Sequence, residues 1–180
     1  MTTAGADDRD EAAPLIVTLT FDEKSQARFD AMRRRHFPPA RNHLSAHLTL
    51  FHKLPGDERD AVCRIIEDAA SDSERQALEV DGVRFFGYGS AYTIRSAALS
   101  RLRADLALSF EAWLTPQDSQ RFAPHVTIQN KAPAQEARAL FETLSAEFEP
   151  FTATATGLSL WRYLGGAWQA AGTFPFRDER

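Results

Sequence analysis

Two histidines, each followed two positions later by a threonine, are the residues of this chain best suited to catalysis. They are His47 with Thr49, in the stretch His-Leu-Thr-Leu, and His125 with Thr127, in the stretch His-Val-Thr-Ile. The unperturbed pKa of histidine is about 6.5, so near neutral pH one imidazole can act as a base and another as an acid. A threonine hydroxyl can donate a hydrogen bond to a phosphate oxygen. Together these groups suit the cleavage of a phosphodiester without a metal.

Each histidine shares one face of an expected strand with its threonine, because residues two apart in a strand point the same way. The apolar residues at the alternate positions of both motifs point into a core. If the two strands meet across a cleft, two imidazoles flank two hydroxyl groups. The sequence therefore predicts catalytic roles for His47 and His125 and phosphate-binding roles for Thr49 and Thr127. The near symmetry of the motifs leaves open which histidine is the acid and which is the base.

The two motifs belong to a pattern that repeats along the chain. The segment His47–Pro55 aligns with His125–Pro133 through identical histidine, threonine, lysine and proline residues. Expected helices and strand pairs follow each segment in the same order. We infer an internal duplication, with halves at residues 15–92 and 93–174.

The elements that position the motifs follow from periodicity and from turn and capping residues. Asp22 is a suitable N-cap for the first helix, and Pro38-Pro39 ends it. We expect strands at residues 15–21, 47–51, 78–86, 90–95, 125–129, 151–162 and 168–174, and helices at residues 23–36, from the turn at 55–57 to about 70, 100–114 and 133–148.

The composition is that of a globular domain and excludes several classes of protein. Of the 180 residues 43% are hydrophobic, and the formal net charge is -4, which does not suit the gripping of a nucleic-acid duplex. The single cysteine rules out an intramolecular disulfide framework, and no apolar run approaches the roughly 20 residues of a membrane span. We expect one domain at residues 14–180 after a disordered acidic tail at residues 1–13. The protein is expected to be a cytoplasmic monomer that binds neither membrane nor duplex DNA.

The paired His-apolar-Thr-apolar motifs resemble those of the two-histidine (2H) phosphoesterases, the superfamily that includes the bacterial enzymes called 2′-5′ RNA ligases. The stretch Arg121-Phe-Ala-Pro-His125 resembles the second motif of that superfamily, and the stretch from Asn42 to Leu54 resembles the first. The likeness covers roughly Leu15 to Phe174, almost the whole chain.

This resemblance implies a fold, an activity and one more site residue. The fold is α+β and bilobal, with duplicated βα units and two antiparallel sheets that face a central cleft. The activity is hydrolysis of 2′,3′-cyclic phosphates to 2′-phosphates, or action on 2′-5′ linkages, at a nucleotide or RNA end and with no cofactor. Many relatives carry an arginine shortly after the second motif, where this chain has Asn130 and Lys131. We therefore expect Lys131 to supply positive charge for phosphate binding.

Several alternatives stay open on the sequence alone. One rival to this activity is action on another phosphodiester, such as an ADP-ribose cyclic phosphate or a 2′-5′ oligoadenylate. Another is ligation in cells, since the same bond can be made or broken through the same transition state. A rival of another class is a non-catalytic module that binds nucleotide or RNA ends.

Other conspicuous side chains are assigned smaller roles. Tyr163 or Trp161, in the last expected strand pair, is a candidate for stacking on a base. No metal site is expected from the nearby histidines, because the odd spacing of His47 and His52 places them on opposite faces of a strand. The basic run 33–35 at a helix end is expected to be solvated.

Overall fold

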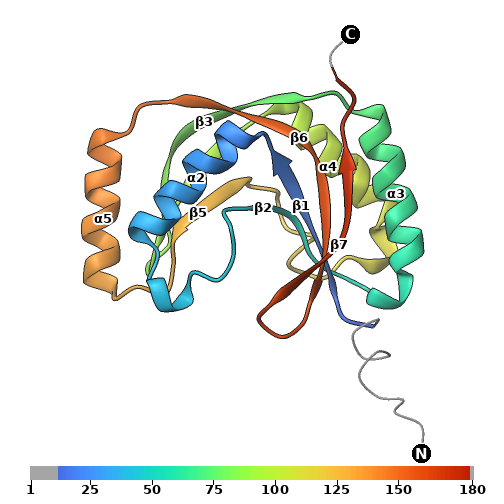
Figure 1. Ribbon diagram of the computed structural model, residues 1–180, viewed down its shortest axis with the longest axis horizontal. Coiled ribbons are helices and arrows are strands. Elements are labelled where there is room, and N and C mark those ends of the chain that lie inside the picture. Colours follow the sequence, from blue (N-terminus) through green and yellow to red (C-terminus); the bar gives the residue numbers. More distant parts are fainter. Residues whose placement is uncertain (1–11, 179–180) are drawn as a thin grey trace, which may run out of the picture.

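A curled sheet of seven strands, with helices along it, makes up residues 12–178, the part of the chain that the computed structural model describes (Figure 1). All strand pairs in it are antiparallel. The strands are β1 (Leu15–Phe21), β2 (Leu48–Leu54), β3 (Gln76–Phe85), β4 (Ser90–Arg95), β5 (His125–Gln129), β6 (Phe151–Tyr163) and β7 (Trp168–Pro175). The α-helices are α2 (Glu23–His36), α3 (Arg59–Asp72), α4 (Ala97–Ser109) and α5 (Ala134–Glu147). Most of the predicted tail, residues 1–11, lies outside the described residues.

Local signals set the ends of the helices. The amide of Ser25 donates to the side chain of Asp22, 2.8 Å away, and α2 begins and ends where the sequence predicts. The helix predicted at residues 100–114 differs from the structure. The hydroxyl of Ser96 caps an earlier start, and a separate 3₁₀ turn, Glu111–Trp113, forms the last part.

The strand order has an internal symmetry. It runs β2-β1-β6-β3-β4-β5, with β7 added beside β6. If β1, β2 and β3 are exchanged for β4, β5 and β6, the same order is obtained in reverse. Such an order favours the predicted duplication, although the expected boundary at residue 92 falls inside β4. The turn between β3 and β4 is the division that the order of elements favours, and β7 has no counterpart.

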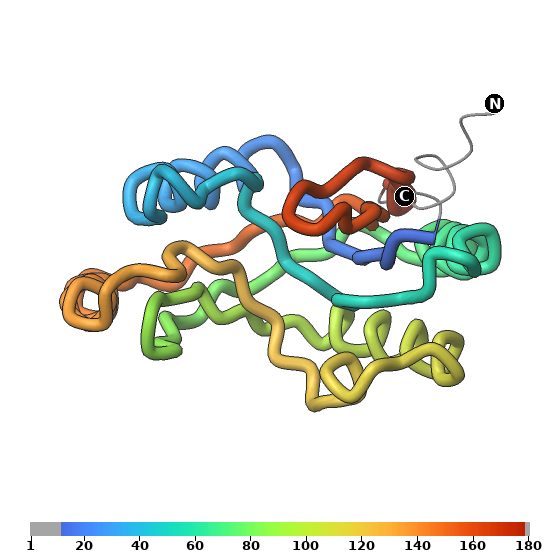
Figure 2. The backbone as a smooth tube through the Cα atoms, turned by 90° about the horizontal axis from the view of Figure 1, so that it is seen from below, coloured from blue at the N-terminus to red at the C-terminus, as the bar shows by residue number. Residues whose placement is uncertain are grey.

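The predicted α+β fold with antiparallel strands is confirmed. The two predicted sheets are instead two arms of one continuous sheet. β3 and β6 join the arms by pairing over Gln76–Val80 and Phe151–Ala155. The sheet curls so far that its end strands, β2 and β5, come into contact (Figure 2). Because these two strands carry the histidine motifs, the curl is what brings the motifs together.

One apolar core connects the strands with α2, α3 and α4. At its centre, the ring of Phe29 on α2 lies 5.0 Å from Phe21, 6.1 Å from Tyr92 and 6.0 Å from Phe151. Phe29 therefore ties α2 to both arms of the sheet. Within residues 12–178 no helix combines the length and the apolar character needed to cross a bilayer.

We predict that Phe29→Ala lowers the free energy of unfolding by about 3–5 kcal/mol, because the change removes a ring that is 1% exposed and leaves a cavity. Urea denaturation measures the effect. Leu108→Ala is the control, since this side chain is 73% exposed and its loss is expected to cost less than about 0.5 kcal/mol. Equal effects of the two substitutions would contradict the assignment of Phe29 to the core.

Candidate active site

His47 and His125 occupy matching places at the starts of the two end strands. His47 immediately precedes β2, and His125 is the first residue of β5. The Nδ1 of His47 lies 2.8 Å from the carbonyl oxygen of Ser45, and the Nδ1 of His125 lies 2.9 Å from that of Ala123. A carbonyl oxygen only accepts hydrogen bonds, so Nδ1 carries a proton in both rings. Each imidazole therefore has its Nε2 free for proton transfer.

Two hollows contain the four predicted motif residues in a crossed arrangement. Each hollow takes its histidine from one motif and its threonine from the other. The smaller hollow, about 340 Å³, is lined in part by Thr49, His52, Arg84, Arg103, Arg121 and His125. The larger hollow, about 660 Å³, is lined in part by Arg33, Phe37, His47, Thr127, Lys131 and Trp168. Because the histidine and threonine of each motif are only two positions apart, the two hollows are neighbours.

The surroundings favour the neutral form of both imidazoles. Burial is the main cause that lowers the pKa of His47 and the pKa of His125 below the ordinary value of histidine. The positive charges of Arg33 and of His125 lower the pKa of His47 further, and that of Arg84 acts in the same way on His125. The hydrogen bonds with the backbone carbonyl groups oppose these shifts. The electrostatic coupling between the two imidazoles agrees with their placement at one site.

Two buried arginines, one lining each hollow, bind the backbone of the motif strands. Arg33 on α2 donates from Nη1 to the carbonyl oxygen of Thr127, 3.1 Å away. Arg103 on α4 donates from Nε to the carbonyl oxygen of Leu50, 2.7 Å away, and its guanidinium lies over the ring of Phe51. Each helix thus binds the motif strand of the other half of the chain. Both side chains are almost fully buried, at 5% exposed for Arg33 and 6% for Arg103.

Neither arginine is predicted from the sequence to support the site. The expectation that Arg33 is solvated with its neighbours is wrong. The signal is present in the helix period, because Arg33 follows Phe29 by one helical turn and Arg103 follows Leu99 in the same way. Both arginines therefore lie on the apolar face of their helix.

A β-bulge places a third histidine, His52, in the smaller hollow. Thr18 of β1 pairs with Thr49, Val17 with Phe51 and Leu15 with Leu54, so β2 contains one extra residue at each of two register shifts, one before and one after Phe51. The first shift changes the alternation by one, and His52 lines the same hollow as Thr49. The prediction that His52 points to the opposite face from the motif histidine is therefore wrong, because it assumes a regular strand.

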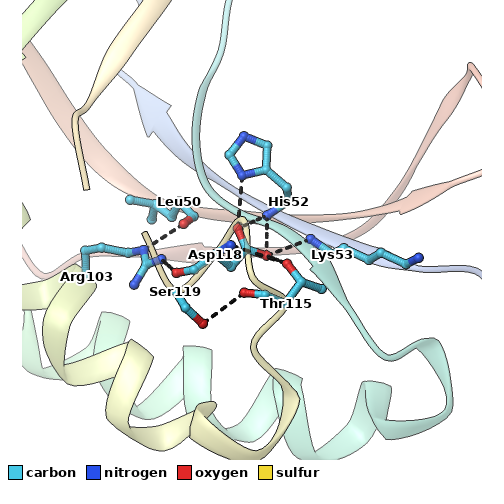
Figure 3. A network of polar contacts seen from close by, with 7 residues as sticks. All are labelled: Leu50, His52, Lys53, Arg103, Thr115, Asp118 and Ser119. Atoms are coloured by element: carbon cyan, nitrogen blue, oxygen red, sulfur yellow. Dashed lines mark hydrogen bonds and ion pairs between the residues drawn. The ribbon is translucent and has the colours of Figure 1, made fainter. Parts of the chain in front are cut away.

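A buried carboxylate, Asp118, holds His52 in position (Figure 3). The backbone amides of His52 and Lys53 donate to its two oxygens over 2.8–3.0 Å, and Nδ1 of His52 lies 3.0 Å from Oδ1. Although burial alone raises the pKa of Asp118, the hydrogen bonds with His52 and Lys53 outweigh it, and the pKa is lowered. Arg103 donates to the Asp118 carbonyl oxygen at 2.6 Å. The loop that contains Asp118 is therefore tied to the bulge of β2.

Trp168 lines the larger hollow beside His47, and the centres of the two rings lie 4.7 Å apart. The residues predicted to stack on a base, Trp161 and Tyr163, do not line either hollow. The indole of Trp161 donates to the hydroxyl of Thr18 over 2.9 Å and packs on Trp168. Trp168 is the first residue of β7 and follows the turn from β6, where Gly165 has a positive φ of 85°.

Lys131 lies at the rim of the larger hollow, just after β5. Its backbone has a positive φ of 59°, and its amide donates to Oδ1 of Asn130 over 2.7 Å. The side chain is exposed and shares this hollow with Thr127. Within the described part of the chain, no three His, Cys, Asp or Glu side chains form a group that could hold a metal ion.

Comparison with protein families assigns the chain to a superfamily. The model of the 2′-5′ RNA ligase superfamily matches residues 21–167. The chain belongs to this superfamily. The match covers both histidine motifs, so the resemblance to two-histidine phosphoesterases is confirmed. A comparison with curated proteins found no match.

Solved structures of the superfamily's fold are similar over almost the whole chain. TT0787 of Thermus thermophilus is 18% identical, with a TM-score of 0.66, and the match covers 93% of this chain and 100% of that one. E. coli LigT complexed with 3′-AMP is 15% identical, with a TM-score of 0.62, and the match covers 92% of this chain and 98% of LigT. At these identities the likeness establishes the fold alone.

We predict that NMR titration of the histidine rings finds the pKa of both His47 and His125 below 6.5, with Nδ1 protonated in the neutral form. Both rings bind protons more readily in the unfolded chain than in the folded one. The free energy of unfolding therefore falls as the pH drops from the unfolded pKa toward the lower folded pKa. Arg84→Gln is expected to raise the pKa of His125 by removing a positive charge, and the control Arg101→Gln is not. An unshifted His125 in Arg84→Gln would contradict this geometry.

Proposed function

We propose that this protein is a metal-independent phosphodiesterase that hydrolyses 2′,3′-cyclic phosphates or 2′-5′ linkages at nucleotide or RNA ends. The observation that carries the proposal is the crossed placement of His47 and His125, each with a free Nε2 and each beside the other motif's threonine. Membership of the 2′-5′ RNA ligase superfamily supports phosphodiester chemistry.

The proposed reaction needs one neutral and one protonated imidazole. The neutral ring takes a proton from water at Nε2 as the water oxygen attacks phosphorus. The bond from phosphorus to the 3′ oxygen breaks, and that oxygen takes the proton from Nε2 of the other ring. The net reaction adds water across the bond between phosphorus and the 3′ oxygen and leaves a 2′-phosphate. The acid and the base exchange protonation states during one turnover.

The groups around the histidines are suited to stabilise negative charge on the phosphate. Thr49 and Thr127 each line one of the hollows, and in this proposal their hydroxyl groups donate hydrogen bonds to the non-bridging oxygens. Lys131 adds a positive charge at the rim of the larger hollow. Arg33 and Arg103 add charge from within the protein, because their donors are directed mainly to carbonyl oxygens and no carboxylate of the described residues neutralises them through an ion pair.

A nucleotide is the ligand class that fits the larger hollow. Its walls combine the aromatic rings of Phe37 and Trp168 with basic side chains, which suits a base attached to a phosphate. E. coli LigT has been crystallised with 3′-AMP, with NADP+ and with ATP, which adds support for this class. We therefore assign Trp168, and not Trp161 or Tyr163, as the residue that stacks on the base.

We predict that the purified protein hydrolyses nucleoside 2′,3′-cyclic phosphates to 2′-phosphates in excess EDTA. His47→Ala and His125→Ala are each expected to lower kcat by about 10²–10⁴, the usual contribution of an acid or a base. His36→Ala is the control, because His36 is the last residue of α2 and its side chain lines neither hollow. Chromatography of the products measures the rate and identifies the 2′-phosphate.

Two outcomes of this assay would contradict the proposal. One is activity that disappears with EDTA, because the metal would then supply the chemistry. The other is activity that survives in the double variant His47→Ala/His125→Ala. Tight binding of cyclic phosphates without turnover would instead identify the protein as a module that binds nucleotide ends.

The pH dependence of kcat/KM provides a separate prediction. The base must be neutral and the acid protonated in the free enzyme, so kcat/KM falls on both sides of an optimum between their two pKa values. The pKa of His47 and the pKa of His125 are both lowered. We therefore expect the optimum of kcat/KM below about pH 6.5. An optimum above about pH 7.5 would mean that other groups act as the acid and the base.

A further inference from the structure

The two hollows differ in chemistry although the motifs that they share are alike. The larger hollow has aromatic walls, at Phe37 and Trp168. The smaller hollow has no tryptophan and is lined by several basic side chains, among them Arg84, Arg121 and His52. Both hollows are lined by basic side chains, and Phe122 also lines the smaller one, so the two differ in the tryptophan of the larger hollow and in the exposed arginines of the smaller one.

The acidic residue that lines the smaller hollow does not neutralise it. Asp118 is 3% exposed, and its oxygens are occupied by the amides of His52 and Lys53 and by the ring of His52. Because this carboxylate accepts the Nδ1 proton of His52, the ring's other nitrogen, Nε2, is left free. In Figure 3 the ring of His52 extends away from Asp118, beyond the polar network.

Arg84 and Arg121 are exposed and free of acidic partners in this part of the molecule. No carboxylate within residues 12–178 forms an ion pair with either of them. Arg84 of β3 pairs with Ala91 of β4, which pairs with Thr127 of β5, so Arg84 lies on the same face of the sheet as the second motif. Its charge also lowers the pKa of His125.

We propose that the smaller hollow binds a second phosphate group of the substrate, held by His52, Arg84 and Arg121 beside the phosphate that reacts. Two guanidinium groups are suitable ligands for a phosphate, which they bind through paired hydrogen bonds. The oriented ring of His52 adds a third donor in its imidazolium form, in which Nε2 also carries a proton. Asp118 is a positioning residue in this site, because it acts by holding His52. Since the second phosphate is part of the substrate assigned above, this site rests on the proposed function.

The stereochemistry of ribose fits this use of the two hollows. In a 2′,3′-cyclic phosphate, the carbon that carries the base and the carbon that leads to the 5′ oxygen flank the reacting edge of the sugar on opposite sides. A base in the larger hollow therefore directs the 5′ substituent toward the smaller one. The 5′ phosphate has two possible sources, which are a free nucleotide with a terminal monophosphate and the last phosphodiester of an RNA chain.

Three substrates test the site and separate the two sources. They are adenosine 2′,3′-cyclic phosphate, the same compound with a 5′-monophosphate, and the dinucleotide ApA that ends in a 2′,3′-cyclic phosphate. We expect kcat/KM to be at least about tenfold higher for one or both 5′-substituted compounds, as one charge-assisted hydrogen bond would provide. A preference for the monophosphate identifies a free nucleotide as the source, and equal values or a preference for ApA identifies RNA.

Variants show whether the preference comes from the smaller hollow. Arg84→Gln and His52→Gln are each expected to lower the ratio of kcat/KM between the 5′-phosphorylated and unphosphorylated substrates by about tenfold. The matched control is Arg101→Gln, an exposed arginine on α4 that lines neither hollow, which leaves the ratio unchanged. A wild-type ratio near one, or an equal ratio in Arg84→Gln and Arg101→Gln, would overturn the proposed site.

Binding of inorganic pyrophosphate gives a measurement that does not depend on turnover. Calorimetry is expected to show binding to the wild-type protein that is weakened about tenfold in Arg84→Gln and unchanged in Arg101→Gln. If this dependence is found but no cyclic phosphate is hydrolysed, the proposed function is wrong and the anion site stands. If cyclic phosphates are hydrolysed and Arg84→Gln binds pyrophosphate like the wild type, the proposed function stands and the second site is wrong.

Discussion

Two buried guanidinium groups hold the motif strands in place, and the geometry of the site depends on them. Arg33 connects α2 to the carbonyl oxygen of Thr127 in β5, and Arg103 connects α4 to that of Leu50 in β2. β2 and β5 are the ends of the sheet, so each has only one strand neighbour to fix it. Hydrogen bonds from charged donors are stronger than those between neutral groups, and burial protects them from water. Each half of the chain thereby fixes the strand that carries the other half's histidine.

The sequence predicts those features of the site that follow from local periodicity. His125 and Thr127 point to one side of β5 because the strand is regular between these two residues, and Asp22 begins α2 because a capping carboxylate needs only a nearby amide. Features that depend on contacts between distant segments are not predicted. His52 enters the smaller hollow only because of a bulge, and the sequence of β2 does not show where the register shifts. The apolar stem of Arg33 allows it to occupy a core position that a count of charges assigns to solvent.

The site combines a symmetric reaction centre with asymmetric surroundings. His47 and His125 have the same hydrogen bond to a carbonyl oxygen two residues earlier, so they begin with equivalent rings. What differs is the identity of the neighbouring side chains, with Trp168 on one side and Arg84 on the other. In the proposed function, the orientation of a bound nucleotide, and with it the division of acid and base roles, therefore depends on residues outside the two motifs.

The wall that carries Trp168 comes from β7, the strand without a counterpart in the other half of the chain. Among the strands of residues 12–178, β7 pairs with β6 alone, and the turn between them contains Gly165 with its positive φ. Insertions or deletions in this hairpin would reshape the wall that the proposed function assigns to the base, and in the described sheet β7 pairs with neither motif strand. Because the ring of Trp168 also lies 4.7 Å from that of His47, such changes would alter the surroundings of one proposed proton-transfer group as well, so evolution or engineering of this hairpin couples the choice of nucleotide to the chemistry.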